Sequence, residues 1–280
     1  MAQFDKFYTK SSIAKQCYDF LCEKIPSVKD GYFLEPSAGG GSFLEFLPRF
    51  DAFDIQPEGE NIKQADFLSL SLEKKDYITI GNPPFGKRSK LAINFFNHAA
   101  KYSKIIAFIV PVSFMKWSVQ KELSSDFHLL DYFYLQENSF TDEGKDFSVR
   151  CVFQIWTKEK IENDLRLKKA PPTKHKDFEL WQYNATEEAK KYIDEDWLYA
   201  VYRQGYKDYN KLFTKADYDE VKKMMDGNIQ FFFMKPLSES AKTFIEIADF
   251  YSLAERNTAT PGFGKADFVS YYTEFKEKSR

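Results

Sequence analysis

Residues 76–85 of this 280-residue chain read Asp76-Tyr77-Ile78-Thr79-Ile80-Gly81-Asn82-Pro83-Pro84-Phe85. The apolar, β-branched first half predicts a short buried strand. The two prolines end that strand, because proline has no N–H for a sheet and restricts the residue before it. The loop presents the Asn82 amide, the Pro83 carbonyl and the Phe85 ring. Two acceptors beside an aromatic face could hold a flat ring with an exocyclic amino group; the alternative is an ordinary turn that packs a phenylalanine.

Strand and helix patterns alternate around this loop. Apolar residues at helical spacing predict a helix over 11–24, capped by Ser11 or Ser12 and ended by Pro26. Strands are expected at 31–35, 50–55, 61–67, 104–111, 129–135 and 149–156, helices from 42, over 91–100 and around 119–123, and a polar loop at 136–148. This order predicts the α/β class, with an open, mostly parallel, Rossmann-like sheet and an antiparallel hairpin at its end.

Four successive predicted strands end in polar or glycine-rich loops. The first ends at Glu35 and is followed by Pro36-Ser37-Ala38-Gly39-Gly40-Gly41-Ser42. The next two end in Asp54-Ile55 and Asp66-Phe67, and the fourth ends at Asn82. Ligands of open α/β sheets bind at the carboxyl ends of the strands. The pattern therefore predicts one small-molecule site built from these four ends.

The two aspartates suggest what this site would bind. A carboxylate at the end of the second strand, Asp54 rather than Asp51, can accept from both hydroxyls of a ribose. Asp66 beside Phe67 could hold an adenine amino group and ring. Each acid taken alone could equally be a solvated loop residue or a helix cap. A dinucleotide fingerprint would need a small residue where Leu44 stands, so an NAD site is disfavoured.

The composition describes a globular protein with 43% hydrophobic and 29% charged residues. Its formal net charge of −2 means that any basic face for nucleic acid must be local. The cysteines (Cys17, Cys22, Cys151) form no Cys-x-x-Cys pair and the histidines are scattered, so no disulfide framework and no metal site are expected. No signal pattern or membrane-length apolar run is present, which favours a cytoplasmic protein without a membrane partner.

The chain is expected to have two domains. Residues 1–160 carry the α/β pattern, and 161–176 form a basic linker around Pro171-Pro172. A solvated tether is favoured over a binding strip for this linker. Residues 177–280 are less periodic, with strands expected at 196–203 and 228–234 and a helix over 240–251, which indicates a smaller α+β domain.

Together these residues resemble the S-adenosylmethionine (SAM)-dependent DNA adenine-N6 methyltransferases. Asn82-Pro83-Pro84-Phe85 is similar to the catalytic tetrad of that family, and Glu35 to Gly41 looks like its cofactor loop. Tyr8-Thr9 resembles the N-terminal cofactor motif, although Lys10 stands where a proline is common. The tetrad follows the cofactor motifs too closely for a domain to fit between them. The order thus resembles the γ group, with target recognition in 177–280.

The resemblance implies a role for each matched residue. The catalytic residues would be Asn82, Pro83, Pro84 and Phe85, and the cofactor-binding residues Tyr8, Thr9, Glu35, Pro36, Ser37, Ala38, Gly39, Gly41, Asp54, Ile55, Asp66 and Phe67. Phe85 and Phe140 would stack on the base, with Phe147 as the competitor of Phe140. Arg203, Lys207, Lys211 and Arg256 are basic residues of the recognition domain that could contact DNA.

The resemblance also implies the reaction. SAM would be the cofactor and S-adenosylhomocysteine its product, and the substrate would be an adenine flipped out of double-stranded DNA, as in restriction-modification systems. A cognate restriction endonuclease and the choice between monomer and dimer are left open. Two alternatives remain: methylation of adenine N6 in RNA, and a non-catalytic SAM-binding specificity subunit.

Overall fold

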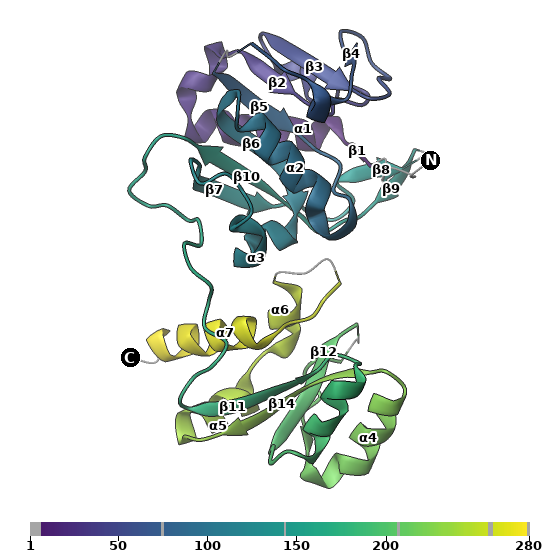
Figure 1. The fold of residues 1–280 in the computed structure, drawn as a ribbon, viewed down its shortest axis with the longest axis vertical. Coiled ribbons are helices and arrows are strands. Elements are labelled where there is room, and N and C mark those ends of the chain that lie inside the picture. The colour runs from purple at the N-terminus through teal and green to yellow at the C-terminus, as the bar shows by residue number, and fades with distance from the viewer. Residues whose placement is uncertain (1–6, 74–75, 143, 206–207, 257–259, 279–280) are drawn as a thin grey trace. The chain divides into compact units, whose positions relative to one another are not determined.

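A mostly parallel seven-stranded sheet forms the centre of the first part of the chain, in the strand order β4-β3-β2-β5-β6-β10-β7. Figure 1 shows this computed structural model, which describes residues 7–73, 76–142, 144–205, 208–256 and 260–278. Neighbouring strands from β4 to β6 pair in parallel. Strand β10 pairs antiparallel with both β6 and β7. The predicted α/β sheet is confirmed, and the predicted antiparallel hairpin, β7 with β10, forms its end, with β7 as the edge strand.

Most of these elements begin and end within about two residues of the predicted bounds. The sheet contains β2 (Phe33–Glu35), β3 (Phe50–Asp54), β4 (Lys63–Gln64), β5 (Tyr77–Gly81), β6 (Ser103–Pro111), β7 (His128–Tyr134) and β10 (Cys151–Thr157), and the helices are α1 (Ser11–Lys24), α2 (Lys90–Ala99) and α3 (Trp117–Gln120). Helix α1 is capped at Lys10, without a side-chain hydrogen bond, rather than at Ser11 or Ser12.

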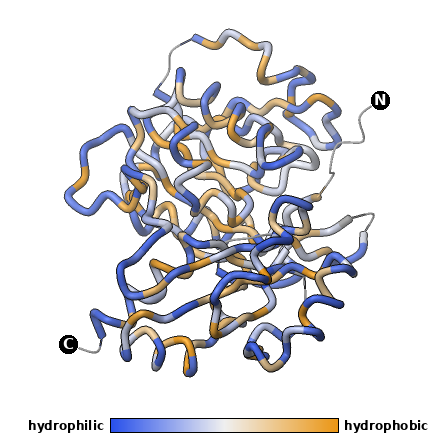
Figure 2. Tube along the Cα trace, turned by 60° about the horizontal axis from the view of Figure 1, so that its bottom comes forward, coloured by the Kyte–Doolittle hydropathy of each residue, from blue (hydrophilic) through white to orange (hydrophobic). Residues whose placement is uncertain are grey.

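Strand β6 is apolar on both faces because each of its faces packs in a different core cluster. Its residues alternate between two core clusters, because successive side chains of a strand point to opposite sides. Ile105, Ala107 and Ile109 pack in the cluster that contains the buried face of α1. Ile106, Phe108 and Val110 pack in the cluster that contains the buried face of α2. Helices therefore cover both faces, as expected for a parallel sheet; Figure 2 colours the chain by hydropathy.

Two elements after the glycine-rich turn differ from the prediction. The helix expected from Ser42 is only a 3-10 turn, Leu44–Phe46. The residue before a proline avoids the α region, and Leu47, which precedes Pro48, is extended with ψ 125°. The strand expected to end at Asp66-Phe67 is also shorter. Beyond β4, Asp66 caps a second 3-10 turn, Phe67–Ser69.

The polar loop expected at 136–148 folds instead as part of a small second sheet. We call this three-stranded sheet the ribbon; it contains β1 (Tyr8–Thr9), β8 (Phe140–Asp142) and β9 (Lys145–Phe147) in the order β1-β8-β9. Gly144 lies at the hairpin turn with φ +78°, a conformation that glycine adopts without strain. The loop prediction was wrong here because the pairing of β8 with β1 spans most of the first unit.

The chain divides into two compact units, Met1–Lys168 and Lys169–Arg280. The first unit includes part of the expected linker. Arg166 donates hydrogen bonds to the backbone carbonyls of Gln120 (2.9 Å), Leu123 (2.8 Å), Ser124 (2.6 Å) and Phe127 (2.8 Å). One guanidinium thereby binds four carbonyls at and just beyond the end of α3, where a helix leaves C=O groups without intrahelical partners. The Gln120 and Ser124 carbonyls also accept backbone N–H groups there. This part of the expected linker is therefore packed and is not a solvated tether.

The second unit is an α+β fold around a four-stranded antiparallel sheet of order β11-β14-β12-β13. Its elements are β11 (Phe178–Tyr183), β12 (Tyr199–Gln204), β13 (Phe213–Thr214), β14 (Gln230–Pro236), α4 (Tyr218–Asp226), α5 (Glu239–Ile247), α6 (Phe250–Glu255) and α7 (Lys265–Lys278). The core is rich in aromatic rings, among them Phe231, Phe232 and Phe233 of β14. Strands β11 and β13 and helices α4 and α7 were not predicted from the sequence.

Candidate functional site

A cavity of about 300 Å³ lies at the carboxyl ends of β2, β3 and β5 in the first unit. Its size is within the range of small-molecule sites, roughly 300–1,000 Å³. The lining residues are Phe7, Tyr8, Thr9, Glu35, Pro36, Ser37, Ala38, Gly39, Ser42, Phe43, Asp54, Ile55, Gln56, Ala65, Asp66, Phe67, Leu68, Asn82, Pro83, Pro84, Phe85, Leu91 and Phe95. The structure thus brings every predicted catalytic and cofactor-binding residue except Gly41 together around one cavity, and the base-stacking candidate Phe140 lies outside its lining.

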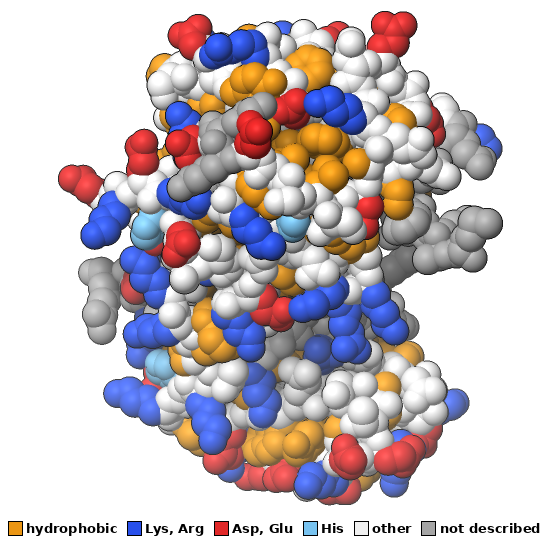
Figure 3. All heavy atoms as spheres, turned by 45° about the horizontal axis from the view of Figure 1, so that its top comes forward, with side chains coloured by type: hydrophobic (Ala, Val, Ile, Leu, Met, Phe, Trp, Pro, Cys, Tyr) orange, Lys and Arg blue, Asp and Glu red, His pale blue; other side chains and the backbone are white. Residues whose placement is uncertain are grey.

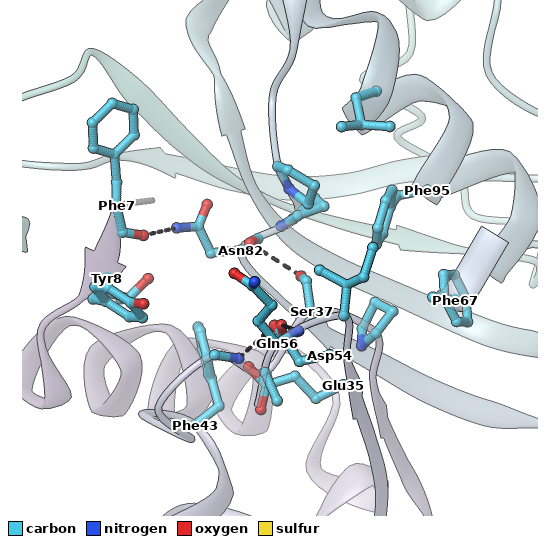
Figure 4. A pocket seen from close by; sticks show the side chains of 18 of the residues that line it. Phe7, Tyr8, Glu35, Ser37, Phe43, Asp54, Gln56, Phe67, Asn82 and Phe95 are labelled. Carbon is cyan, nitrogen blue, oxygen red and sulfur yellow. Dashed lines mark hydrogen bonds between the residues drawn. The ribbon is translucent and has the colours of Figure 1, made fainter. Parts of the chain in front are cut away.

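Asn82 is held by its own amide nitrogen (Figure 4). Its Nδ2 donates to the carbonyl of Phe7 at 3.3 Å, and Ser37 Oγ donates to the Asn82 backbone carbonyl at 3.2 Å. The Asn82 Oδ1 is buried and has no hydrogen-bond partner. Because Nδ2 is engaged by Phe7, the oxygen is the part of the amide that remains for a ligand.

Asp54 ties the glycine-rich turn to the end of β3. Its carboxylate accepts from the backbone N–H of Gly39 at 2.8 Å and of Gln56 at 2.7 Å. Asp51, the acid not chosen from the sequence, accepts from the Tyr77 hydroxyl at 2.6 Å and does not line the cavity. The structure therefore places Asp54 where a ligand can reach it, with lone pairs beyond the two in use.

Glu35 is the most deeply buried acid of the cavity wall, with 2% of its surface exposed. Burial, helped by the negative charge of Asp54, raises the pKa of Glu35 well above its ordinary value. Its Oε2 has no hydrogen-bond partner. Gly81 leaves room for this side chain, because an added Cβ there would lie 3.3 Å from Glu35 Cγ. A cationic ligand group would supply the missing partner and favour the ionised acid.

Strand β1 contributes Tyr8 and Thr9 to the same wall. The Tyr8 hydroxyl donates to Glu58 Oε1 at 2.6 Å, and burial together with this hydrogen bond raises the pKa of Tyr8 to about 12. The Tyr8 ring lies over Gly39, where an added Cβ would meet Cε1 at 3.1 Å. The Thr9 hydroxyl is buried and, like the Glu35 carboxyl, lacks a hydrogen-bond partner.

Unpaired buried polar atoms are concentrated at this cavity. Across the described ranges, the buried side-chain atoms without a hydrogen-bond partner are Thr9 Oγ1, Glu35 Oε2 and Asn82 Oδ1. All three residues line the cavity. Each such atom costs about 1–3 kcal/mol unless something supplies its hydrogen bond. The arrangement fits a ligand that carries hydrogen-bond donors to all three positions.

The opposite part of the wall is aromatic. Phe67 is 1% exposed and lies 5.5 Å from the Phe95 ring of α2, measured between centroids. Asp66 accepts from Leu68 N at 3.0 Å and from Ser69 Oγ at 2.9 Å, and so it also acts as a cap. A ring slot bordered by a carboxylate is compatible with a purine that presents an amino group.

Two sequence-based site residues need correction. Gly41 does not line the cavity; its N–H donates to Ala38 O at 2.7 Å and its φ is +84°, so its role is to close the turn. Phe140 is 0% exposed and packs in the core beside α1. It does not line the cavity, whereas Phe67, which is almost as buried, does. Phe147, the competitor, is half-buried and stacks on Phe7.

Several lining residues were missed, and their sequence signals explain why. Gln56 is one position beyond the predicted strand end, so a search extended past Ile55 would have found it. Leu91 and Phe95 are apolar residues at helical spacing. A helix that only packs against the core has the same pattern, so this spacing does not mark them as cavity residues. Phe7 contributes a backbone carbonyl, a group that carries no sequence signal at all.

The basic residues of the second unit are mostly engaged with partners of their own. Arg203 donates to Gln204 Oε1 at 3.3 Å and to Gln230 Oε1. Lys211 pairs with Glu220 at 2.9 Å and Arg256 with Glu274 at 3.0 Å; Lys207 lies outside the described residues. Basic and acidic side chains are interspersed on the face drawn in Figure 3. DNA contact by these four residues stays a prediction.

The described residues contain no group of three or more His, Cys, Asp or Glu side chains placed to hold a metal ion. Nor does any helix in those ranges combine the length and apolar character needed to span a membrane. The fold and cavity thus define an α/β protein with a cavity of small-molecule size at its strand ends.

Solved structures with a similar fold include methyltransferases. A candidate RNA methyltransferase from Pyrococcus horikoshii is 14% identical, with a TM-score of 0.45 over 55% of this chain and 87% of that chain. The modification subunit of a candidate type I restriction enzyme from Vibrio vulnificus is 14% identical, with a TM-score of 0.43 over 94% of this chain and 59% of that subunit. The type IIL restriction-modification enzyme MmeI, solved with DNA, is 12% identical, with a TM-score of 0.43 over 81% of this chain and 50% of that chain.

At these identities and TM-scores the comparison is a statement of similarity. The sheet of this chain is itself mixed and mostly parallel. No family model matches the sequence, and no curated protein matches it either.

Proposed function

We propose that this chain is a SAM-dependent methyltransferase that methylates the N6 amino group of adenine in DNA. One observation carries the proposal: the buried Asn82 Oδ1 has no partner, its amide nitrogen is fixed by Phe7, and it stands beside Pro83 and Phe85 on the cavity wall. That geometry provides an acceptor next to an aromatic ring, which is what an exocyclic amine on a flat base requires.

The residues around the cavity fit the proposed cofactor, which supplies an activated methyl group when it is bound. Asp54 would accept from its ribose hydroxyls, and Asp66 with Phe67 would hold its adenine amino group and ring. Glu35 and Thr9 would satisfy the polar atoms at its amino-acid end. Each of these groups lines the same cavity, and two of them are unpaired in the protein.

The chain's own part in the reaction would be to orient the substrate amine. The N6 lone pair of adenine is delocalised into the ring, so the amine is a weak nucleophile. Asn82 Oδ1 and the Pro83 carbonyl would accept its two hydrogens and localise that lone pair on nitrogen. Orientation of this kind contributes several kcal/mol in well-positioned reactions. The proton would leave after transfer, so no general base is needed before it.

Phe85 would stack on the base once it leaves the duplex. Base–aromatic stacking is worth about 1–3 kcal/mol by alanine substitution, which offsets part of the cost of unstacking. Pro84 would hold the loop in shape, because its ring fixes one backbone angle. In the same proposal residues 177–280, which lie within the second unit, supply target recognition, and residues 161–176 connect them to the catalytic domain, residues 1–160.

Nucleoside mass spectrometry tests the proposal directly. The protein is incubated with SAM carrying a deuterated methyl group and with double-stranded DNA, single-stranded DNA or RNA, and the products are digested to nucleosides. Labelled N6-methyldeoxyadenosine is expected from DNA. Label in RNA alone would favour the RNA alternative, and bound cofactor without any product would favour the non-catalytic subunit.

Asn82→Ala provides the residue-level test. Methylation should fall by about 10²–10³-fold, the loss typical of a key transition-state contact, while the cofactor Kd measured by calorimetry stays within about twofold. Asn94→Ala is the matched control, because Asn94 lies on the exposed side of α2. Near-normal turnover by Asn82→Ala would contradict the proposed role.

A further inference from the structure

The part of the chain that holds the Asn82 amide is itself held by the ribbon. Tyr8 and Thr9 pair with Thr141 and Phe140 of β8. The Phe7 carbonyl that accepts from Asn82 Nδ2 immediately precedes this pairing. The position of that carbonyl therefore depends on the attachment of β1 to the ribbon.

Side chains reinforce this attachment at both ends of β1. The rings of Phe7 and Phe147 stack with their centroids 4.3 Å apart and their planes 9° from parallel. At the other end, Lys10 Nζ pairs with Asp146 Oδ1 at 2.7 Å, and Lys10 N donates to Ser139 O at 3.2 Å. Phe147 does not line the cavity, so its contact with the site passes through Phe7.

A primary amide can be turned by half a rotation, which exchanges its oxygen for its NH2 group. In one orientation Asn82 Nδ2 donates to the Phe7 carbonyl, and Oδ1 remains to accept hydrogen bonds. In the other orientation two oxygens would face each other, which is repulsive, and the amide would present only donors. The Phe7 carbonyl thus selects the orientation that an amine substrate requires.

We propose that Phe7 and Phe147 are positioning residues: their stacked rings fix the main chain of β1, so that the Phe7 carbonyl holds the Asn82 amide with its oxygen toward the substrate amine. This inference rests on the proposed function, because it assigns the orientation of Asn82 to a reaction. It does not make Phe147 a base-stacking residue.

Asn82→Asp separates the two roles. A carboxylate presents an acceptor oxygen whichever way it is turned. The Phe7 carbonyl then meets an oxygen in either orientation, so it has no orientation to select. In the protein with Asn82 intact, Phe147→Leu should lower kcat about tenfold without changing the cofactor Kd. Phe147→Tyr should keep kcat at the level of the unsubstituted protein, because the ring stack is kept. In the Asn82→Asp background, Phe147→Leu should change kcat less than about twofold. Equal losses in both backgrounds would overturn the inference, since Phe147 would then act on the substrate directly.

Phe46→Leu is the matched control. Phe46 is half-buried like Phe147 and is stacked on one aromatic neighbour, Tyr18, at 6.4 Å between centroids, but it does not line the cavity. Its replacement should leave kcat unchanged within about twofold. A loss matching that of Phe147→Leu would mean that removing any stacked ring of this unit slows the reaction, which would also refute the assignment.

The second readout needs no activity. With selective ¹⁵N-asparagine labelling, the Asn82 side-chain NH2 should exchange slowly with solvent in the unsubstituted protein and at least about tenfold faster in Phe147→Leu, with no change in Phe46→Leu. Unchanged exchange in Phe147→Leu would refute the coupling. If exchange responds as expected but neither DNA nor RNA is methylated, the positioning of the amide stands and the proposed function fails.

Discussion

Glu35→Gln is expected to stabilise the ligand-free protein, by an amount that grows with pH. In the unfolded chain Glu35 would titrate near its ordinary pKa of 4.5, whereas burial raises its pKa well above that value in the folded protein. Between these two pKa values the folded state keeps a proton that the unfolded state has lost, so stability falls as pH rises. Each pH unit in this window costs about 1.4 kcal/mol. Glutamine has the same shape but no proton to lose, so it avoids the loss.

The difference in unfolding free energy between Glu35→Gln and the parent protein should therefore be constant below about pH 4.5 and rise by about 1.4 kcal/mol per pH unit above it. It should level off once the pH exceeds the folded-state pKa of Glu35. Because Glu35 is only 2% exposed, solvent screening reduces this effect little. Urea unfolding in half-unit pH steps, followed by hydrogen exchange of peptides from β2 and β5, measures the first unit separately from the second.

Glu60→Gln is the control, because it removes one carboxylate at an exposed position. A difference for Glu35→Gln that does not change with pH would refute the reasoning, since it would mean that the folded protein already pairs or solvates the carboxylate. The same substitution should weaken cofactor binding about tenfold or more, because a neutral amide cannot form an ion pair with a cationic group. Stability and affinity would then change in opposite directions.

Three further substitutions test other parts of the structure. Gly39→Val should weaken cofactor binding more than about tenfold with the fold retained by circular dichroism, because φ is +52° and a Cβ would crowd the Tyr8 ring; unchanged affinity would show that the turn does not touch the cofactor. Asp54→Asn should cost about 1–3 kcal/mol of binding free energy by calorimetry, since one oxygen cannot serve both Gly39 and Gln56 and a ribose as well; a smaller loss than that of Glu60→Gln would exclude Asp54. Arg166→Ala should destabilise the first unit by about 2–3 kcal/mol in urea, because four hydrogen bonds from its guanidinium are lost; exposed Lys168→Ala is its control, and equal midpoints would contradict this role.

The parts of the fold that could be predicted are those encoded by local patterns. The run from Tyr77 to Gly81 is rich in apolar and β-branched residues, which predicts a buried strand. The structure has strand β5 over the same residues. Polar residues placed just after such runs, Asp54 and Asn82 among them, meet at one edge because parallel strands end together. The sequence therefore located the cavity wall, although the roles of its residues stay proposals.

The parts that could not be predicted depend on partners far along the chain. Phe140 has an aromatic ring that could stack on a base. However, its pairing with Thr9 in the ribbon places that ring in the core. The Phe7 carbonyl holds Asn82, yet a backbone group has no sequence signature. The helix expected from Ser42 is absent for a local reason instead. Pro48 keeps Leu47, the residue before it, out of the helical region of backbone angles.

The pairing of β1 with β8 has a consequence for how the protein is made. Tyr8 is paired with Thr141, and β10, which lies between β6 and β7, ends only at Thr157. During synthesis the first strand must wait until nearly the whole first unit has left the ribosome, because its partner does not yet exist. Long-range pairing of this kind also slows folding, since the loop must close before its contacts form. In a nascent chain stalled before β8, the Phe7 carbonyl would therefore not be held in place to accept from Asn82. The site would be completed in one of the last folding steps of this unit.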